Sequence, residues 1–176
     1  MFANIIAVAA FGALAAIASP TPEKRGEYHT VTLINNCGVG TAAFEVAGGK
    51  MYYGTTTLDG PVEGGLAWIT GAYGCGDANG LNCGDVEFTL VNPTSSNGYA
   101  QTAADYSLQQ NSGQTHSYKY PMDFRFDGCN PTPYTPGECT GPTQSDCPGA
   151  FVGTDATDGT VFQCSNDNVG ITITFC

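Results

Sequence analysis

The sequence has few basic residues and very few histidines. Lysine and arginine together number 5, against 16 aspartates and glutamates, and the 176 residues include 2 histidines. Nucleic acids and anionic lipids are recognised through positive charge, so the formal net charge of −11 argues against a nucleic-acid partner and against a membrane partner. The scarcity of histidine and the lack of any CxxC pair predict that no metal is bound, and no pattern points to a cofactor.

Helical periodicity is also missing after residue 26. Instead, 24 glycines and frequent Asn, Asp, Thr and Pro divide the chain into short segments. Nine segments combine β-branched and aromatic residues with period-two alternation, and this pattern predicts strands of an all-β sandwich. They are Tyr28–Asn35, Ala42–Ala47, Lys50–Tyr53, Leu66–Tyr73, Val86–Val91, Ala104–Gln109, Met122–Phe126, Thr160–Gln163 and Gly170–Phe175. By contrast, Asp127–Gly149 holds five prolines and three cysteines and is predicted to be a loop region pinned by disulfides.

The long apolar run lies at the N-terminus. Residues 1–18 are predicted to be a signal peptide that is cut after Ala18, and residues 19–25 a pro-peptide ending at the dibasic pair Lys24-Arg25. The mature domain would then be residues 26–176, with three basic and fifteen acidic residues and a charge of about −12. No second apolar run follows, so we expect a secreted, soluble protein without a membrane anchor.

Eight cysteines remain in the predicted mature chain. An even number of cysteines behind a signal peptide indicates a disulfide framework. Eight cysteines allow 105 pairings, and their spacing alone does not select one.

Several short motifs resemble those of thaumatin-like proteins, in the same order along the chain. They begin in the first predicted strand and end at the last cysteine, so the resemblance covers the whole predicted mature domain. The motifs are Val31-Thr32-Leu33-Ile34-Asn35-Asn36-Cys37, Ala103-Ala104-Asp105-Tyr106-Ser107-Leu108, Tyr120-Pro121-Met122-Asp123-Phe124, Cys147-Pro148-Gly149-Ala150-Phe151, Phe162-Gln163-Cys164 and Ile171-Thr172-Ile173-Thr174-Phe175-Cys176.

This resemblance implies a thaumatin-like β-sandwich with a short disulfide-pinned loop region. The usual ligand of the family is β-1,3-glucan, so the expected partner is a cell-wall polysaccharide. The resemblance also implies a disulfide between the first and last cysteines, for which loop-closure entropy predicts a stabilisation of about 4–5 kcal/mol. The implied pairs are Cys37–Cys176, Cys75–Cys83, Cys129–Cys164 and Cys139–Cys147.

The acidic cleft of the family is matched only in part. That cleft uses an Arg, a Glu and three Asp residues. Asp105 stands at the Glu position and either Asp155 or Asp158 at the late Asp, whereas Ile69–Tyr73 lacks the Arg and Asn111–Lys119 lacks both middle acids. Glycoside hydrolysis needs one protonated and one ionised carboxyl, so Asp105 with Asp155 or Asp158 is the candidate catalytic pair. The alternative is that Asp105 is an exposed strand residue and that the other two belong to turns.

Sugar binding needs less than catalysis. A shallow groove with an aromatic platform is sufficient, and Tyr73, Tyr118 and Tyr120 are candidate ligand-binding residues because we expect them to be exposed. Trp68 is instead expected in the core, and His116 on the surface rather than in the role of a catalytic base.

Three functions follow as hypotheses. The first is a secreted, cell-wall-associated, monomeric thaumatin-like protein that binds β-1,3-glucan with little or no hydrolysis. The second is a secreted antifungal protein, effector or enzyme inhibitor, although the acidic chain offers no basic face for attacking a membrane. The third is an active endo-β-1,3-glucanase.

Overall fold

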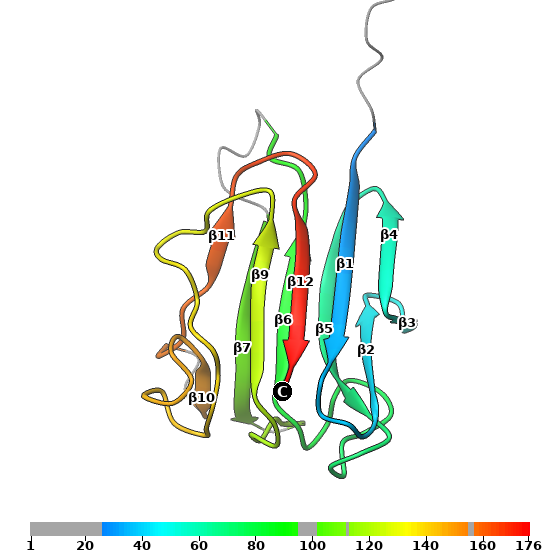
Figure 1. Ribbon diagram of the computed structural model, residues 1–176. Coiled ribbons are helices and arrows are strands. Elements are labelled where there is room, and N and C mark those ends of the chain that lie inside the picture. Colours follow the sequence, from blue (N-terminus) through cyan, green and yellow to red (C-terminus); the bar gives the residue numbers. More distant parts are fainter. Residues whose placement is uncertain (1–25, 95–101, 112, 155–156) are drawn as a thin grey trace, which may run out of the picture.

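The computed structural model describes residues 26–94, 102–111, 113–154 and 157–176. These residues form strands, turns and loops without a helix, which confirms the all-β prediction (Figure 1). Accordingly, the described part of the chain has no helix that is long and apolar enough to cross a membrane. The predicted signal peptide and pro-peptide lie outside the described residues, so both stay predictions.

The smaller of two sheets has four strands and faces the viewer in Figure 1. Its two central strands are parallel, with Val31 opposite Ile171 and Leu33 opposite Ile173. The two outer strands run antiparallel to them. The first and last strands of the chain are therefore neighbours. In order across the sheet, the strands are β4 (Thr55–Asp59), β1 (Tyr28–Asn35), β12 (Gly170–Phe175) and β9 (Met122–Asp127).

The larger sheet lies behind the first and carries the acidic residues discussed below. Its main path is antiparallel except at one edge, where β10 runs parallel to β7. Two short strands, β11 (Phe162–Cys164) and β8 (Gln114–Thr115), also pair with β7. In order, the main path is β10 (Phe151–Gly153), β7 (Thr102–Asn111), β6 (Asp85–Leu90), β5 (Val62–Thr70), β2 (Thr41–Val46) and β3 (Lys50–Tyr53).

The core lies between the facing sides of the two sheets. Side chains alternate along each strand, and in the smaller sheet this alternation buries Val31, Ile173 and Phe124 while the intervening residues face outward. Phe44 and Phe88 of the larger sheet meet edge to face, with ring centroids 5.8 Å apart. Each such buried side chain contributes about 1.5–3 kcal/mol to folding, so the core is the main source of stability. The two sheets thus form a sandwich-like fold.

The loop region that was predicted at Asp127–Gly149 lies at residues 128–150 beside this sandwich, because Asp127 still belongs to β9 (Figure 1). One isolated bridge joins Met122 to Cys139, and another joins Thr132 to Gln163, so the loops follow the edges of both sheets. The cysteines of the structure form four disulfides with the pairs that the thaumatin-like resemblance implies. These are Cys37–Cys176, Cys75–Cys83, Cys129–Cys164 and Cys139–Cys147.

All nine predicted strands have a counterpart, and the bounds of Tyr28–Asn35, Lys50–Tyr53 and Gly170–Phe175 agree in full. Three strands, β4, β8 and β10, were not predicted. Each of them is held by pairing to β1 or β7 and has little apolar alternation of its own. Their formation therefore depends on the neighbouring strand.

Candidate functional site

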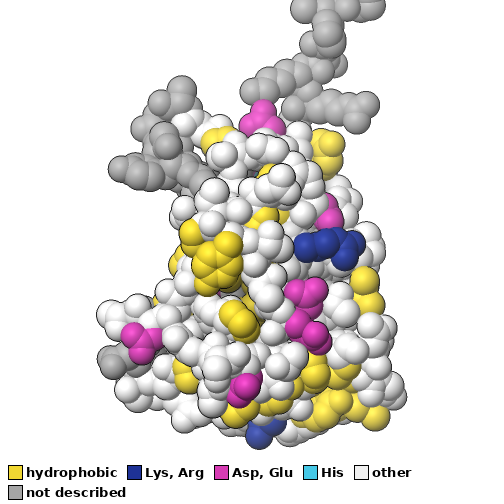
Figure 2. Space-filling model, turned by 60° about the vertical axis from the view of Figure 1, so that its left-hand side comes forward, with side chains coloured by type: hydrophobic (Ala, Val, Ile, Leu, Met, Phe, Trp, Pro, Cys, Tyr) yellow, Lys and Arg dark blue, Asp and Glu magenta, His cyan; other side chains and the backbone are white. Residues whose placement is uncertain are grey.

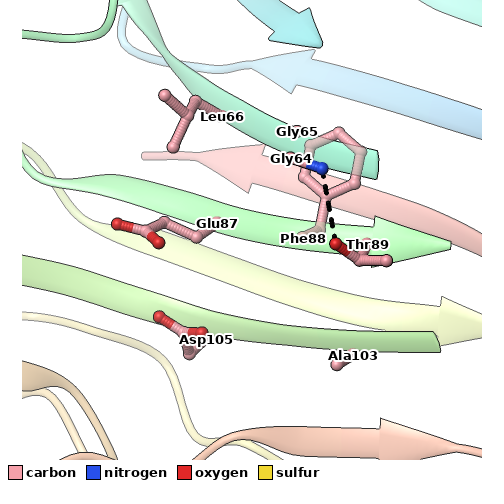
Figure 3. Close-up of a pocket in the computed structure, with 8 residues that line it drawn as sticks. All are labelled: Gly64, Gly65, Leu66, Glu87, Phe88, Thr89, Ala103 and Asp105. Atoms are coloured by element: carbon pink, nitrogen blue, oxygen red, sulfur yellow. Dashed lines mark hydrogen bonds between the residues drawn. The ribbon is translucent and has the colours of Figure 1, made fainter. Parts of the chain in front are cut away.

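A hollow of about 310 Å³ opens on the outer face of the larger sheet, across β5, β6 and β7. Figure 3 shows the side chains that line it, with two carboxylates side by side and the glycines of β5 opposite Thr89. Its size lies at the small end of the range for ligand sites, which is about 300–1,000 Å³. The lining residues are Gly64, Gly65, Leu66, Glu87, Phe88, Thr89, Ala103 and Asp105.

The hollow exists because side chains are missing from β5. The pairing of β5 with β6 shifts register between Val62 and Gly65, which marks a β-bulge, and Gly64 has a φ of 62° that favours glycine. A Cβ at Gly65 would lie 2.4 Å from Cε2 of Phe88, so only glycine leaves room for that ring. The amide of Gly64 makes a long hydrogen bond of 3.4 Å to Oγ1 of Thr89. The bulge therefore leaves a depression where a regular strand would place side chains.

Two carboxylates from neighbouring strands stand in one row of this hollow. Leu66 pairs with Glu87, and Glu87 pairs with Asp105, so the three side chains project from the same face of the sheet. Directly opposed Cβ atoms in an antiparallel pair are about 4.5–5.5 Å apart, which places the two acids within reach of one ligand group. Burial, and then the negative charge of Glu87, raise the pKa of Asp105 to about 8.

This arrangement gives the two acids different chemical abilities near neutral pH. With its raised pKa, Asp105 keeps a proton and can donate one hydrogen bond while it accepts others. A carboxylate that has lost its proton only accepts hydrogen bonds. Leu66 and Ala103 add apolar surface, and none of the lining residues is basic. The hollow can thus offer both hydrogen-bond donors and hydrogen-bond acceptors to hydroxyl groups.

A third acid, Asp85, lies two residues before Glu87 on β6 and is fully buried. Burial first, and then the charges of Glu87 and Asp105, raise its pKa well above the usual range. Ser107, its partner on β7, is also buried. Among the described residues, no hydrogen-bond partner is present for either oxygen of the Asp85 carboxyl or for the Ser107 hydroxyl.

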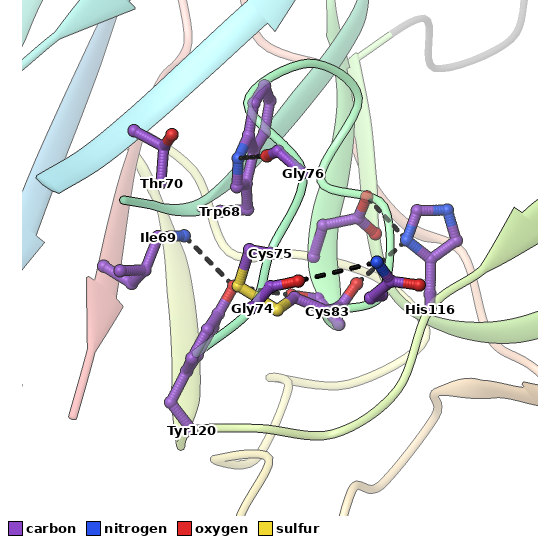
Figure 4. Close-up of a disulfide and its surroundings, with 12 residues drawn as sticks. Trp68, Ile69, Thr70, Gly74, Cys75, Gly76, Cys83, His116 and Tyr120 are labelled. Atoms are coloured by element: carbon purple, nitrogen blue, oxygen red, sulfur yellow. Dashed lines mark hydrogen bonds and ion pairs between the residues drawn. A yellow bond between two sulfur atoms is a disulfide. The ribbon is translucent and has the colours of Figure 1, made fainter. Parts of the chain in front are cut away.

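His116 is buried in the same cluster, so the expectation that it lies on the surface is wrong. The backbone amide of His116 donates to the carbonyl of Gln109, which folds this segment back over β7. Its Nδ1 donates to the carbonyl oxygen of Cys83 at 2.9 Å and lies 3.3 Å from Oδ2 of Asp85. Figure 4 shows His116 beside the loop that the Cys75–Cys83 disulfide closes. This loop covers the cluster and separates it from solvent.

Two aromatic residues beside the same loop are also buried. The prediction that Trp68 is buried is confirmed, and its Nε1 donates to the carbonyl of Gly76 at 3.1 Å (Figure 4). The expectation that Tyr120 is exposed is wrong, because only 2% of its surface is accessible. Its hydroxyl accepts from the amide of Ile69 and donates to the carbonyl of Gly84, both at 3.0 Å. Tyr120 therefore holds strands together and offers no platform to a ligand.

The other predicted site residues that the structure describes do not line the hollow. Asp155 is outside the described residues. Asp158 is exposed and does not line the hollow, and its backbone oxygen accepts a hydrogen bond from Nε2 of Gln144. Tyr73 is 40% exposed but packs on Tyr120, with ring centroids 5.2 Å apart, and does not line the hollow either.

Tyr118 is only half-buried, packs against the edge of the core and is likewise absent from the lining. Of the predicted catalytic and ligand-binding residues within the described part of the chain, Asp105 is the one that lines the hollow.

Glu87 was not predicted as a site residue. The alternation in Asp85–Leu90 does place residues 85, 87 and 89 on one face, and that pattern was the available signal. The pattern does not reveal which residue of the next strand lies beside Glu87. The register that pairs Glu87 with Asp105 depends on contacts between the strands.

The surface as a whole is acidic. On the face that Figure 2 shows, acidic side chains are scattered over the molecule and basic ones are few. In the part of the chain that the structure describes, no three His, Cys, Asp or Glu side chains converge into a metal site. No family model and no curated protein matches this chain.

Proposed function

We propose that this chain is a secreted protein that binds a cell-wall polysaccharide through the hollow on β5, β6 and β7. The observation that carries the proposal is the pair Glu87 and Asp105 in a depression with apolar walls. Sugars present hydroxyl groups around a partly apolar ring, and a donor, acceptors and an apolar surface are what such a ligand needs. The resemblance to thaumatin-like proteins supports β-1,3-glucan as the first ligand to test.

Secretion is part of the same proposal. The predicted signal peptide and the four disulfides support it, because structural disulfides persist in oxidising compartments. The acidic surface keeps such a protein in solution and away from anionic lipids and nucleic acids.

A co-sedimentation assay on insoluble β-1,3-glucan, chitin and cellulose tests the proposal. The wild type is expected to sediment with at least one of the three, and Ala103→Tyr to stay in solution, because the new ring would fill the hollow from a half-buried position on β7. Gln109→Tyr is the matched control, since Gln109 lies on the same face of β7 outside the lining. Equal binding by wild type and Ala103→Tyr, or no binding to any polymer, would refute the proposal.

Glycoside hydrolysis is a second candidate, and the raised pKa of Asp105 favours it. A glycosidase needs an acid that is protonated at the working pH beside an ionised carboxylate, and cross-strand neighbours have the close spacing of retaining enzymes. Release of reducing sugar from soluble β-1,3-glucan would then fall to background in both Asp105→Asn and Glu87→Gln. If the wild type releases no reducing sugar, or if both variants release as much as the wild type, glycoside hydrolysis by this pair is excluded.

A further inference from the structure

We propose that the sugar-binding surface continues from the hollow beneath residues 76–82, where Trp68, Asp85 and Ser107 bind a further sugar unit once this loop swings away. This inference rests on the proposed function, because it extends the same site to a longer ligand. Its basis is a second row of side chains on the outer face of the larger sheet, which is buried where residues 76–82, here called the lid loop, lie over it.

The second row runs beside the row of side chains in the hollow. Residues two apart on a strand project from the same face, so the two rows are separated by about 6.6–6.8 Å along the strands. The first row is Leu66, Glu87 and Asp105, and the second is Trp68, Asp85 and Ser107. Asp85 pairs directly with Ser107. A Cβ on Gly80 would lie 3.2 Å from Cγ of Trp68 and 3.4 Å from Oδ2 of Asp85, so the lid loop touches both side chains.

The second row offers the groups that a sugar needs. Trp68 supplies a flat apolar ring, and the other two residues supply polar atoms. No hydrogen-bond partner is present among the described residues for either carboxyl oxygen of Asp85 or for the hydroxyl of Ser107, and both residues are buried. Nδ1 of His116 lies 3.3 Å from Oδ2 of Asp85, but its hydrogen is directed to the carbonyl of Cys83. Buried polar groups without partners destabilise the closed form, and the hydroxyl groups of a sugar would satisfy them.

The lid loop is held on the sheet by few contacts. Gly80 is the only buried residue among residues 76–82, so the loop adds no large side chain to the core. Its hydrogen bonds to the rest of the protein join Trp68 to Gly76 at 3.1 Å (Figure 4), Thr70 to Asp77 at 3.4 Å and Thr115 to Asn82 at 3.0 Å. The Cys75–Cys83 disulfide pins the two ends of the loop together, so the loop can swing as a unit while β5 and β6 stay folded. Segments with so few buried contacts open at a lower free energy than the whole domain.

Hydrogen exchange of the Trp68 side chain tests the opening without any ligand. Trp68 is the only tryptophan of the chain, so its indole signal is unambiguous. We expect protection of the indole hydrogen to be at least about tenfold weaker than that of the Val31 and Ile173 amides in the core. Asp77→Ala/Asn82→Gly, which removes two of the loop's hydrogen bonds, should weaken it further. Protection equal to that of the core amides would overturn the inference and leave binding in the open hollow unaffected.

Fluorescence titration with β-1,3-glucose oligomers of increasing length tests the binding itself. We expect the shortest oligomer to bind in the hollow without changing the emission of Trp68. Longer oligomers should shift this emission in a saturable way and bind about tenfold more tightly. Asp85→Ala and Ser107→Ala each remove polar atoms of the second row without adding bulk, and each should lose this gain with length. The affinity for the shortest oligomer should stay the same in both variants.

The matched control is Thr172→Val, at a polar residue that is also buried but belongs to the smaller sheet. It is expected to keep the full gain with length. If the wild type shows no gain with length, or if Asp85→Ala and Ser107→Ala keep it, the inference is overturned while polysaccharide binding in the hollow stands. Failure of oligomers of every length to bind the wild type would instead refute the proposed function together with the inference.

Discussion

Asp105 and Glu87 lie on neighbouring strands, and each changes what the other can do. Asp105 is half-buried on β7, and Glu87 faces it from β6. Ionisation of Asp105 would place a second negative charge in a site that already excludes part of the solvent, which is why its pKa rises to about 8. The chemistry of this residue therefore depends on its partner and its burial, and an isolated aspartate would not have it.

The raised pKa of Asp105 predicts a pH-dependent stability. Below its ordinary pKa of 3.8 the carboxyl is protonated in the folded and the unfolded chain, so it has no effect there. As the pH rises from about 4 to about 8, the unfolded chain ionises first, and the folded state loses stability. We expect Asp105→Asn to raise the free energy of unfolding by on the order of 2 kcal/mol at pH 8 and to leave it unchanged near pH 3.

Urea unfolding at several pH values between these limits measures this effect. Asp59→Asn, at an exposed position, serves as the control and is expected to show no such trend. A difference between Asp105→Asn and wild type that stays constant over the whole pH range would contradict the account.

Tyr120 offers a test of a single buried hydroxyl. Tyr120→Phe removes the acceptor for the amide of Ile69 and the donor for the carbonyl of Gly84, and leaves both backbone groups buried without a partner. We expect the free energy of unfolding to fall by about 1–3 kcal/mol. Tyr53→Phe, at a residue that is 55% exposed, should change it by less than about 0.5 kcal/mol. Similar values for the two variants would show that the Tyr120 hydrogen bonds contribute little.

The burial of Tyr120 and His116 could not be predicted from their neighbours in the sequence. Both residues lie in a polar stretch that is typical of an exposed segment. They become buried because the Cys75–Cys83 loop folds over them and Phe175 of the last strand packs edge-on against Tyr120, with ring centroids 5.5 Å apart. Contacts between residues far apart along the chain decide such burial.

At the scale of elements, alternation predicted the strands that contribute to the core. In Gly170–Phe175 the apolar side chains face the core and the threonines project to the other face of the sheet, where Thr172 is buried and Thr174 half-buried. The predicted bounds agree with the structure. Thr55–Asp59 lacks this signal because a run of three threonines precedes its single large apolar residue, and β4 forms by pairing with β1. Phe151–Gly153 is equally short and is ordered by parallel pairing with β7. An element that depends on a partner for its order carries little information in its own sequence.

The bulge in β5 predicts a specific sensitivity to side-chain volume. Gly65→Ala would place a Cβ 2.4 Å from Cε2 of Phe88, so the ring must move, and we expect a loss of about 1–3 kcal/mol in the free energy of unfolding. Gly137→Ala is the control, because its added Cβ would meet only Pro148 at an ordinary distance of 3.6 Å. Thermal and urea unfolding compare the two. A loss at Gly65 no larger than that at Gly137 would argue against close packing under the hollow.

At the scale of the whole molecule, the Cys37–Cys176 disulfide joins the ends of neighbouring strands β1 and β12 across a sequence separation of 139 residues. Closing so long a loop restricts the unfolded chain strongly, so Cys37→Ala/Cys176→Ala should lower the free energy of unfolding by about 4–5 kcal/mol. The Cys139–Cys147 pair spans 8 residues, and its removal should lower it by about 2–3 kcal/mol. Chemical unfolding of the two double variants gives the comparison, and the reverse order would contradict the loop-length argument.

The candidate site shows the same limit of sequence reasoning at this scale. The motif around Asp105 identifies it as a candidate site residue, and alternation along β7 predicts the face of the sheet from which its side chain projects. Glu87 and the glycines of β5 come from other strands, and their place beside Asp105 depends on strand order and on a register shift. Strand order and register are properties of the assembled sandwich, so the hollow became visible only with the structure.

The most direct test of polysaccharide binding at the hollow is a nuclear magnetic resonance titration of the labelled protein with a soluble oligosaccharide. Binding there predicts shifts of the backbone amide signals that concentrate at Glu87, Thr89, Ala103 and Asp105 and saturate with the ligand. The opposite face of the sandwich, around Thr32, should stay unchanged. Saturable shifts confined to residues 128–150 or to the outer face of the smaller sheet, or no shifts with any oligosaccharide, would contradict the account.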